Sequence, residues 1–248
     1  MSFLLNIMKL YKGDCLKVMK TIQDKSIDAI ITDPPYGTTA CKWDSVIDFK
    51  LMWEQLNRII KPNGAIVLFG SEPFSSALRM SNIKNYKYDW YLKKTQADGF
   101  LNSKRQPLRE YELASVFNVK KYNPQFIKVE PFKTKALATG KQSGVHGKVK
   151  NELKYEIRDY KYPKNTIEFK KVKRSDNVHP TQKPVALMEY LIKTYTNKNE
   201  TVLDFTMGSG STGVAAKNTN RNFIGIEQDE NYFNIAQQRI KETEYKLF

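Results

Sequence analysis

The segment from residue 27 to residue 32 most constrains the fold, because it is apolar except for Asp28 and has the length of a buried strand. Other short apolar runs alternate with amphipathic stretches from the N-terminus to about residue 120. This alternation is typical of strand and helix units that build a mainly parallel sheet. The sequence therefore predicts an α/β fold.

The same pattern places further elements along the chain. Residues 86–93 and 112–119 are rich in aromatic and β-branched side chains, and we expect these two strands to pair near the sheet edge. A helix is predicted from Pro184 to Tyr195, because proline is favourable in a first helical turn. The remaining predicted strands are residues 8–11, 65–69, 201–205 and 223–226, and the remaining predicted helices are residues 15–22, 49–60 and a segment that begins at Val214.

The peptide Asp33-Pro34-Pro35-Tyr36 follows the buried strand directly and looks like an active-site loop. Pro34 biases Asp33 away from helical geometry, and both prolines lack an N–H, so a carboxylate and free carbonyls point outward. The ring of Tyr36 could stack on a planar base, whose amine would bond to Asp33 and to the Pro34 carbonyl. An ordinary proline-rich turn at the end of a strand is the alternative.

Basic residues are concentrated in one part of the chain. The 248 residues contain 41 Lys or Arg against 26 Asp or Glu, a net charge of +15, as expected of a protein that binds a polyanion. Residues 120–174 hold 16 of these basic residues with only five acidic ones, interleaved with seven tyrosines and phenylalanines. We interpret this segment as a DNA-contacting insertion, and a solvated basic loop is the alternative.

The composition argues against several other classes of protein. The two cysteines, Cys15 and Cys41, support neither a disulfide framework nor a thiolate zinc site, and they indicate a reducing cytoplasm. His146 and His179 are too few and too scattered for a metal site, so we expect no metal. No apolar stretch approaches transmembrane length, and the apolar cluster at residues 3–5 is too short for a secretory signal.

A glycine-rich loop, Met207-Gly208-Ser209-Gly210-Ser211-Thr212-Gly213, follows the strand predicted at residues 201–205. Its glycines let backbone N–H groups approach a ligand, and the next helix would favour an anionic group at its N-terminus. The loop lacks the lysine of a P-loop and the spacing of a dinucleotide fingerprint. Glu227 ends the next strand, where its carboxylate could accept bonds from both hydroxyls of a ribose. The pattern indicates a nucleoside-like ligand with a charged tail, and a turn that only tightens a crossover is the alternative.

A stiff polar peptide, His179-Pro180-Thr181-Gln182-Lys183-Pro184, lies between the basic insertion and the C-terminal units. If it lies beside the glycine loop in space, Lys183 could hold a carboxylate and the prolines could wall the pocket. A linker is the alternative.

These motifs, in this order, resemble those of the S-adenosylmethionine-dependent DNA amino-methyltransferases, specifically the beta group, in which the catalytic peptide precedes the cofactor loop. The resemblance covers nearly the whole chain outside the insertion. It implies a Rossmann-like methyltransferase fold in permuted order, with a mainly parallel sheet and an antiparallel edge strand. It also implies a catalytic part at residues 1–119, a basic target-recognition insertion at residues 120–178 and a cofactor-binding part at residues 179–248.

The resemblance also implies a role for each motif. The peptide Asp33-Pro34-Pro35-Tyr36 would be catalytic and would grip a flipped base. The glycine loop and Lys183 would hold the methionine part of S-adenosylmethionine, and Glu227 would hold its ribose. Asp14 and Cys15 would line the pocket for its adenine. The implied cofactor-binding residues are Asp14, Cys15, Asp33, Lys183, Pro184, Asp204, Phe205, Thr206, Met207, Gly208, Ser209, Gly210, Ser211, Thr212, Glu227 and Gln228.

The loop entry departs from the family pattern. The family often has Asp-Pro-Phe there, whereas this chain has Asp204-Phe205-Thr206. The difference leaves open which side chain covers the cofactor.

The activity that the resemblance implies is site-specific methylation of the N6 amine of adenine in double-stranded DNA. An Asp-led tetrapeptide is commoner in the family for adenine, and a Ser-led one for cytosine. The alternatives are transfer to the N4 amine of cytosine, an RNA or protein glutamine substrate, and a DNA-binding subunit without activity. Family habit further suggests a homodimer, a cognate restriction nuclease and a bacterial or phage-encoded enzyme that works at the nucleoid in the cytoplasm.

Overall fold

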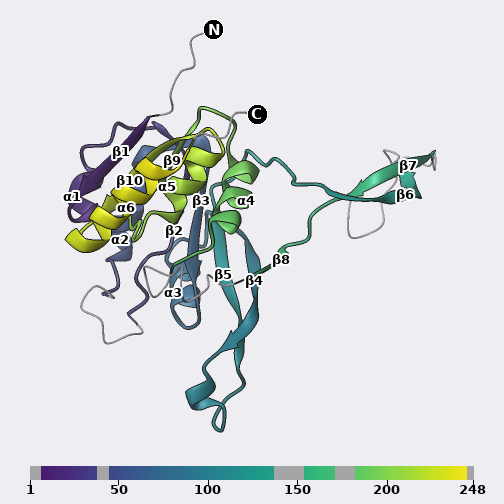
Figure 1. Ribbon diagram of the computed structural model, residues 1–248, viewed down its shortest axis with the longest axis horizontal. Coiled ribbons are helices and arrows are strands. Elements are labelled where there is room, and N and C mark those ends of the chain that lie inside the picture. Colours follow the sequence, from purple (N-terminus) through teal and green to yellow (C-terminus); the bar gives the residue numbers. More distant parts are fainter. Residues whose placement is uncertain (1–6, 38–44, 137–153, 171–181, 245–248) are drawn as a thin grey trace. The chain divides into compact units, whose positions relative to one another are not determined.

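The computed structural model describes residues 7–37, 45–136, 154–170 and 182–244, which form two compact units (Figure 1). One unit comprises the chain up to Asn123 together with the chain from Asn165 onward, and the other is Pro124–Lys164. The predicted insertion at residues 120–178 is longer than the second unit, and its C-terminal boundary lies outside the described residues. The predicted division of the chain into three parts stays a prediction.

A mainly parallel sheet forms the centre of the larger unit. Its strands in the described residues are β1 (Met8–Lys12), β2 (Ile27–Thr32), β3 (Ile60–Gly70), β4 (Tyr86–Asp98), β5 (Arg109–Phe117), β8 (Thr166–Phe169), β9 (Thr201–Asp204) and β10 (Asn222–Glu227). They lie in the order β1-β10-β9-β2-β3-β5-β4-β8, and of these β5 alone runs antiparallel to its neighbours. The predicted α/β class is confirmed. The reversed strand β5 is not at the edge of the sheet as predicted, because β4 and β8 lie between it and that edge.

Helices cover both faces of this sheet. Those in the described residues are α1 (Cys15–Met19), α2 (Phe49–Ile59), α3 (Phe74–Ser81), α4 (Val185–Tyr195), α5 (Ser211–Asn218) and α6 (Glu230–Glu242). Alternate residues of β2 face opposite layers: Ala29 and Ile31 pack with α4, α5 and α6, and Ile30 packs with α1, α2 and α3. Figure 1 shows α4, α5 and α6 together over one face. Burial on both faces explains why β2 is an almost continuous apolar run.

Several predicted element boundaries differ from the structure, among them those of β4 and β5, which both extend further into the hairpin than predicted. Helix α5 begins at Ser211, not at Val214, because Gly210 has a φ angle of +79° and lets the chain turn into the helix there. Helix α1 ends at Met19 rather than at residue 22. Strand β3 begins at Ile60, which pairs with Ile27 of β2 ahead of an irregularity in the register. No helix in the described part of the chain is long and apolar enough to cross a membrane.

The second unit is a small antiparallel hairpin with exposed aromatic side chains. Its strands are β6 (Ile127–Ala136) and β7 (Lys154–Lys161). The Phe126 ring packs edge-on against Tyr160 and Tyr162, with ring centroids 4.6 and 5.1 Å apart. Lys133 lies over the ring of Tyr155, with its Nζ 4.8 Å from the ring centroid. Aromatic and cation–π contacts therefore supply much of the packing in this unit.

We expect Gly210→Ala to destabilise the larger unit more than Gly99→Ala. Both glycines have a positive φ angle, but a Cβ on Gly210 would also lie 2.9 Å from the Cβ of Ala236, whereas nothing lies within 4 Å at Gly99. The conformational penalty alone is about 1–2 kcal/mol, and overpacking adds about 1–3 kcal/mol at Gly210. Urea unfolding of the two variants measures the difference, and equal losses would contradict it.

Candidate active site

The loops that follow β2, β9 and β10 meet at one edge of the sheet. Leu203 in β9 pairs with Ile30 of β2 on one side and with Ile224 of β10 on the other. Because these strands run parallel, their carboxyl ends, and therefore the loops that follow them, lie at the same edge. The loops border a cavity of about 450 Å³. This volume is in the range of small-molecule sites.

The cavity wall contains the predicted site residues except Pro184 and Gly210. Pro184 instead precedes the first residue of α4 as its N-cap, and Gly210 packs against Ala236 of α6. Residues 179–181 lie outside the described residues. The predicted residues in the wall are Asp14, Cys15, Asp33, Pro34, Pro35, Tyr36, Lys183, Asp204, Phe205, Thr206, Met207, Gly208, Ser209, Ser211, Thr212, Glu227 and Gln228.

Other residues of the wall were not predicted from the sequence. Gly13 adjoins the predicted Asp14, so its position in the polar turn after β1 was a usable signal. The others, apart from Gln182 of the polar peptide at residues 179–184, lie in no motif and reach the cavity only through packing. They are Leu16, Ser45, Val46, Ile47, Asp48, Gln182, Met188, Ile226 and Tyr232.

Asp204, at the end of β9, is buried and joins three parts of the site. Its carboxylate accepts hydrogen bonds from the hydroxyls of Thr32 and Thr212, each at 2.5 Å, and from the N–H of Thr206 at 3.2 Å. Burial raises the pKa of this carboxyl from 3.8 to about 6, although the hydrogen bonds oppose the shift. Asp204 therefore connects the end of β2, the loop after β9 and the first turn of α5.

Glu227, at the end of β10, holds its carboxylate in a fixed orientation. One oxygen accepts the N–H of Gly208 and the other accepts the N–H of Asp229, both at 2.9 Å. Burial raises the pKa of this carboxyl, although the backbone hydrogen bonds oppose the rise. A carboxylate has about four acceptor positions, and those that the backbone N–H groups leave open could accept the hydroxyls of a diol in the cavity.

The loop after β2 holds Asp33 by both its backbone and its side chain. The Thr206 hydroxyl donates to the Asp33 carbonyl at 3.1 Å, which joins this loop to the one after β9. The Tyr36 hydroxyl donates to one carboxylate oxygen of Asp33, and the Lys183 ammonium donates to the other at 2.5 Å. The Tyr36 ring stacks on Phe74 of α3, with centroids 4.9 Å apart. Asp33 is thus held by Tyr36 of its own loop, by Lys183 and by Thr206 of the loop after β9.

Lys183 belongs to a chain of alternating charges. Its ammonium lies 2.5 Å from Asp33 and 3.5 Å from Glu112 of β5, while Lys94 of β4 lies 2.5 Å from Glu112 and 2.6 Å from Asp98. Burial would lower the pKa of Lys183, but the two carboxylates outweigh it and raise this pKa. Burial would likewise raise the pKa of Glu112, but Lys183 and Lys94 outweigh it and lower this pKa. Glu112 and Lys94 were not predicted, because neither lies in a motif.

The glycine loop provides donors for an anionic ligand. Ser211 lines the cavity, and its Oγ is buried without a hydrogen-bond partner among the described residues. The first turn of α5 also leaves backbone N–H groups without partners inside the helix. Glu227 on the other side would accept hydroxyls, so the donor set fits a nucleoside-like ligand with a charged tail.

The described residues contain no group of three or more His, Cys, Asp or Glu that could hold a metal ion. Cys41, His146 and His179 lie outside them. Cys15 is in the cavity wall, and burial raises the pKa of its thiol to about 12. A neutral thiol is a weakly polar wall group rather than a nucleophile.

Comparison with known proteins gives one family over most of the chain. A model of the DNA methylase family, whose members act at N6 or N4 amines, matches residues 27–238. The chain is also similar to the type II methyltransferase M.HinfI of Haemophilus influenzae, with 28% identity over 93% of this chain and 67% of that protein.

Two solved structures extend the comparison. A crystal structure of the M1.HpyAVI–SAM complex is similar with a TM-score of 0.65 and 31% identity, covering 94% of this chain and 99% of that one. The PvuII DNA methyltransferase, described as cytosine-N4-specific, has a TM-score of 0.68 at 16% identity, covering 94% of this chain and 86% of that one. At that identity the second likeness concerns the fold alone.

The raised pKa of Asp204 predicts a pH-dependent stability. The folded chain holds this proton more tightly than the unfolded chain, so folding takes up a proton between pH 3.8 and about 6. The contribution of Asp204 therefore lowers the free energy of unfolding as pH rises through this window, by at most about 1.4 kcal/mol per pH unit. Asp204→Asn should remove this slope, because the amide does not titrate.

Urea unfolding at pH 4.5 and pH 7 measures the effect. The matched control is Glu230→Gln, which changes a carboxylate that is 70% exposed and should leave the pH dependence as in the wild type. The same pH dependence in the wild type and in Asp204→Asn would contradict the prediction.

Proposed function

We propose that the target of this protein is the N6 amine of a flipped adenine in DNA. The chain belongs to the DNA methylase family of S-adenosylmethionine-dependent amino-methyltransferases. The observation that carries the proposal is the position of Asp33, which shares one cavity with the glycine loop and Glu227. The leading Asp of the tetrapeptide favours adenine, because in the family an Asp-led peptide is commoner for adenine than for cytosine.

The cavity wall fits the parts of the cofactor. S-adenosylmethionine supplies an electrophilic methyl group on a sulfonium. The free acceptor positions of Glu227 suit the two ribose hydroxyls, and the first turn of α5 with Ser211 suits the carboxylate of the methionine part. Asp14 and Cys15, at the start of α1, would line the adenine pocket. The roles of these residues rest on the family resemblance together with this geometry.

The chemistry requires help because the lone pair of an exocyclic amine is delocalised into the ring. Asp33 and the Pro34 carbonyl would accept the two N–H bonds and thereby favour a pyramidal nitrogen, which attacks the methyl group. The new N–C bond forms as the S–C bond breaks, and the amine loses a proton. Tyr36 and Lys183 each occupy one position on the Asp33 carboxylate, so about two acceptor positions remain for the amine.

The surrounding charges support the same step. Asp33, Lys183, Glu112, Lys94 and Asp98 together contribute three carboxylates and two ammonium groups. Their net charge is therefore −1, which stabilises positive charge that develops on the amine nitrogen. Lys183 retains a third N–H donor, which could reach the carboxylate of the methionine part.

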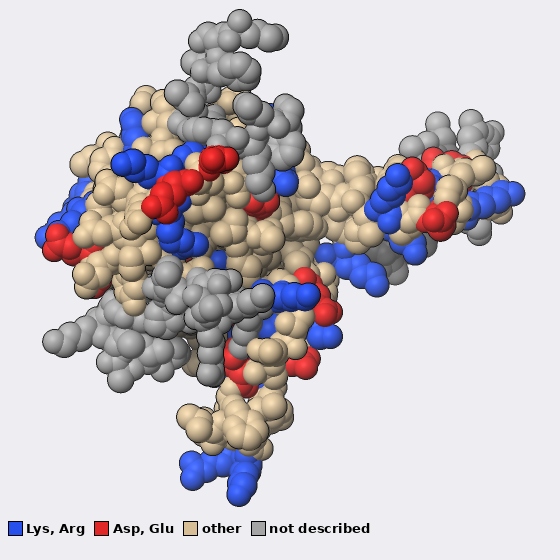
Figure 2. All heavy atoms as spheres, viewed as in Figure 1, with Lys and Arg blue, Asp and Glu red and all other residues tan. Residues whose placement is uncertain are grey.

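The second unit supports a role in DNA recognition. Lys133, Arg158 and Lys161 lie over the rings of Tyr155, Tyr160 and Phe132, and Figure 2 shows further basic side chains on this unit. Cations would contact phosphates, and polar or aromatic side chains would read bases. We therefore propose residues 120–178 as the target-recognition part. We also expect a cytoplasmic enzyme, a homodimer and a cognate restriction nuclease, which stay predictions from the resemblance.

We expect Asp33→Ala to lower methyl transfer at least about 100-fold while S-adenosylmethionine binding changes little, because Asp33 contacts the amine rather than the main cofactor groups. Transfer of radiolabelled methyl groups to mixed DNA and calorimetric titration of the cofactor measure the two quantities. Glu230→Ala, which removes an exposed carboxylate on α6, is the control. Near-normal transfer by Asp33→Ala would overturn the assigned role.

The methylated base should be N6-methyladenine. Nuclease digestion of DNA treated with the protein, followed by mass analysis of the nucleosides, measures it directly. Single-molecule sequencing of the same DNA gives the recognition sequence. N4-methylcytosine without methyladenine would overturn the choice of base and leave the methyltransferase assignment intact.

A further inference from the structure

The hairpin of β4 and β5 ends in a tip, residues 99–108, that presents two large apolar side chains to solvent. Phe100 and Leu101 are 79% and 99% exposed. Figure 1 shows that this hairpin continues well past the neighbouring strand β3 of the same unit. Adjacent, almost fully exposed apolar side chains at the end of an extended element indicate a binding surface rather than a core position.

Backbone hydrogen bonds give the tip a defined conformation. The short 3₁₀ helix Phe100–Asn102 follows Gly99, whose φ angle is +94°. The N–H of Ser103 donates to the Phe100 carbonyl at 3.0 Å, and the N–H of Arg105 donates to the Asn102 carbonyl at 2.8 Å. Phe100 and Leu101 are therefore held outward by the local fold, so that little conformational entropy is lost when they bind.

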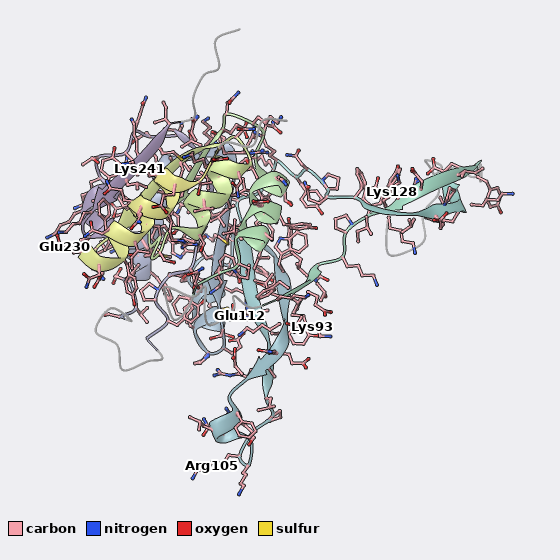
Figure 3. The ribbon with its side chains drawn as sticks, in the orientation of Figure 1. Lys93, Arg105, Glu112, Lys128, Glu230 and Lys241 are labelled. Carbon is pink, nitrogen blue, oxygen red and sulfur yellow. The ribbon has the colours of Figure 1, made fainter. Side chains whose placement is uncertain are left out.

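The charge at the tip identifies the chemistry of the partner. Residues 99–109 contain Lys104, Arg105 and Arg109 and no acidic residue, and all three cations are exposed. Figure 2 shows basic side chains at the end of the hairpin, and Figure 3 places Arg105 there. Cations beside an apolar pair match DNA, because cations neutralise phosphates and apolar side chains insert at base steps.

The base of the hairpin is connected to the active site. Glu112 lies in β5 (Figure 3) and pairs with Lys183, which pairs with Asp33. From Glu112 the path runs along β5 to Arg109, across to its partner Asp98 and on to Leu101, a span of at most about 25 Å at the rise of a strand. Counted from Glu112, this is about seven base-pair steps of ~3.4 Å, so a duplex bound at the active site can extend to the tip.

We infer that residues 100–105 are a second DNA contact, in which Lys104 and Arg105 bind phosphates and Phe100 and Leu101 press against base pairs of the duplex that flanks the target base. This inference rests on the proposed function, since it takes the DNA substrate as its partner. The contact belongs to the larger unit and is separate from the basic hairpin of β6 and β7. It would hold the duplex near the flipped base while the second unit reads sequence.

The first test measures the charge contact. Binding of a fluorescent mixed-sequence duplex is followed by anisotropy over a range of salt concentrations, for the wild type and for Lys104→Ala with Arg105→Ala. Two lost phosphate contacts should reduce the slope of log affinity against log salt by about two. The control is Lys198→Ala with Lys241→Ala, which removes the same charge from exposed positions after α4 and on α6 and should keep the slope. An equal slope for the tip variant and the control would overturn the charge contact.

The second test measures the apolar contact. Phe100→Ala with Leu101→Ala should lower kcat/KM for methyl transfer to plasmid DNA about 5- to 100-fold, with unchanged calorimetric binding of S-adenosylmethionine. The control is Met80→Ala with Ile83→Ala, which removes apolar side chains that are 70% and 53% exposed at the end of α3. Unchanged cofactor binding shows that the variants are folded.

The outcomes separate this inference from the proposed function. A wild type that methylates DNA while both tip variants behave as their controls overturns the inference alone. A wild type that neither binds nor methylates DNA overturns the inference together with the proposed function. Sedimentation tests a third outcome. If Phe100→Ala with Leu101→Ala loses self-association but keeps DNA binding, the tip binds a second copy of the chain and the DNA contact is overturned.

Discussion

The buried carboxylate of Asp204 is the interaction on which the site depends. It accepts the hydroxyls of Thr32 and Thr212, so one side chain joins the end of β2 to the first turn of α5. A buried carboxylate is unfavourable without such donors. The donors and the carboxylate therefore stabilise each other only when the end of β2 and the start of α5 are side by side. The Thr206 hydroxyl repeats the connection by donating to the Asp33 carbonyl.

A second constraint is the alternation of charges from Asp33 to Asp98. Lys183 is almost fully buried between two carboxylates, and Lys94 is buried in the same way. Buried ammonium groups are stable only with such partners, so the position of each charge depends on the next one. The chain of contacts runs from the loop after β2, through β5, to β4. The Asp33 carboxylate and the exposed hairpin are thus parts of one connected structure.

Much of the fold could be predicted because its signals are local. Burial on both faces makes β2 an apolar run, and the boundaries Ile27–Thr32 agree with the structure. Two prolines and an aspartate mark the loop after it without any knowledge of the rest. The helix start at Ser211 was missed because Ser211 and Thr212 look like loop residues. The left-handed conformation of Gly210, which starts the helix there, is visible only in the structure.

The alternation of apolar and amphipathic stretches in the sequence determined the α/β class. The motifs and their order indicated the family and most of the residues around the cavity, because each motif is a short peptide whose chemistry is local. The tertiary structure decided which distant residues complete the site. Glu112 and Lys94 were ordinary polar residues of two strands in the sequence, and only the pairing of β4 with β5 brings Lys94 to Glu112, which the tertiary fold places beside Lys183. The exposure of Phe100 and Leu101 was likewise decided by the length of the hairpin. Ion pairs and exposure depend on distances between segments, and such distances are set by packing rather than by the residues of any one segment.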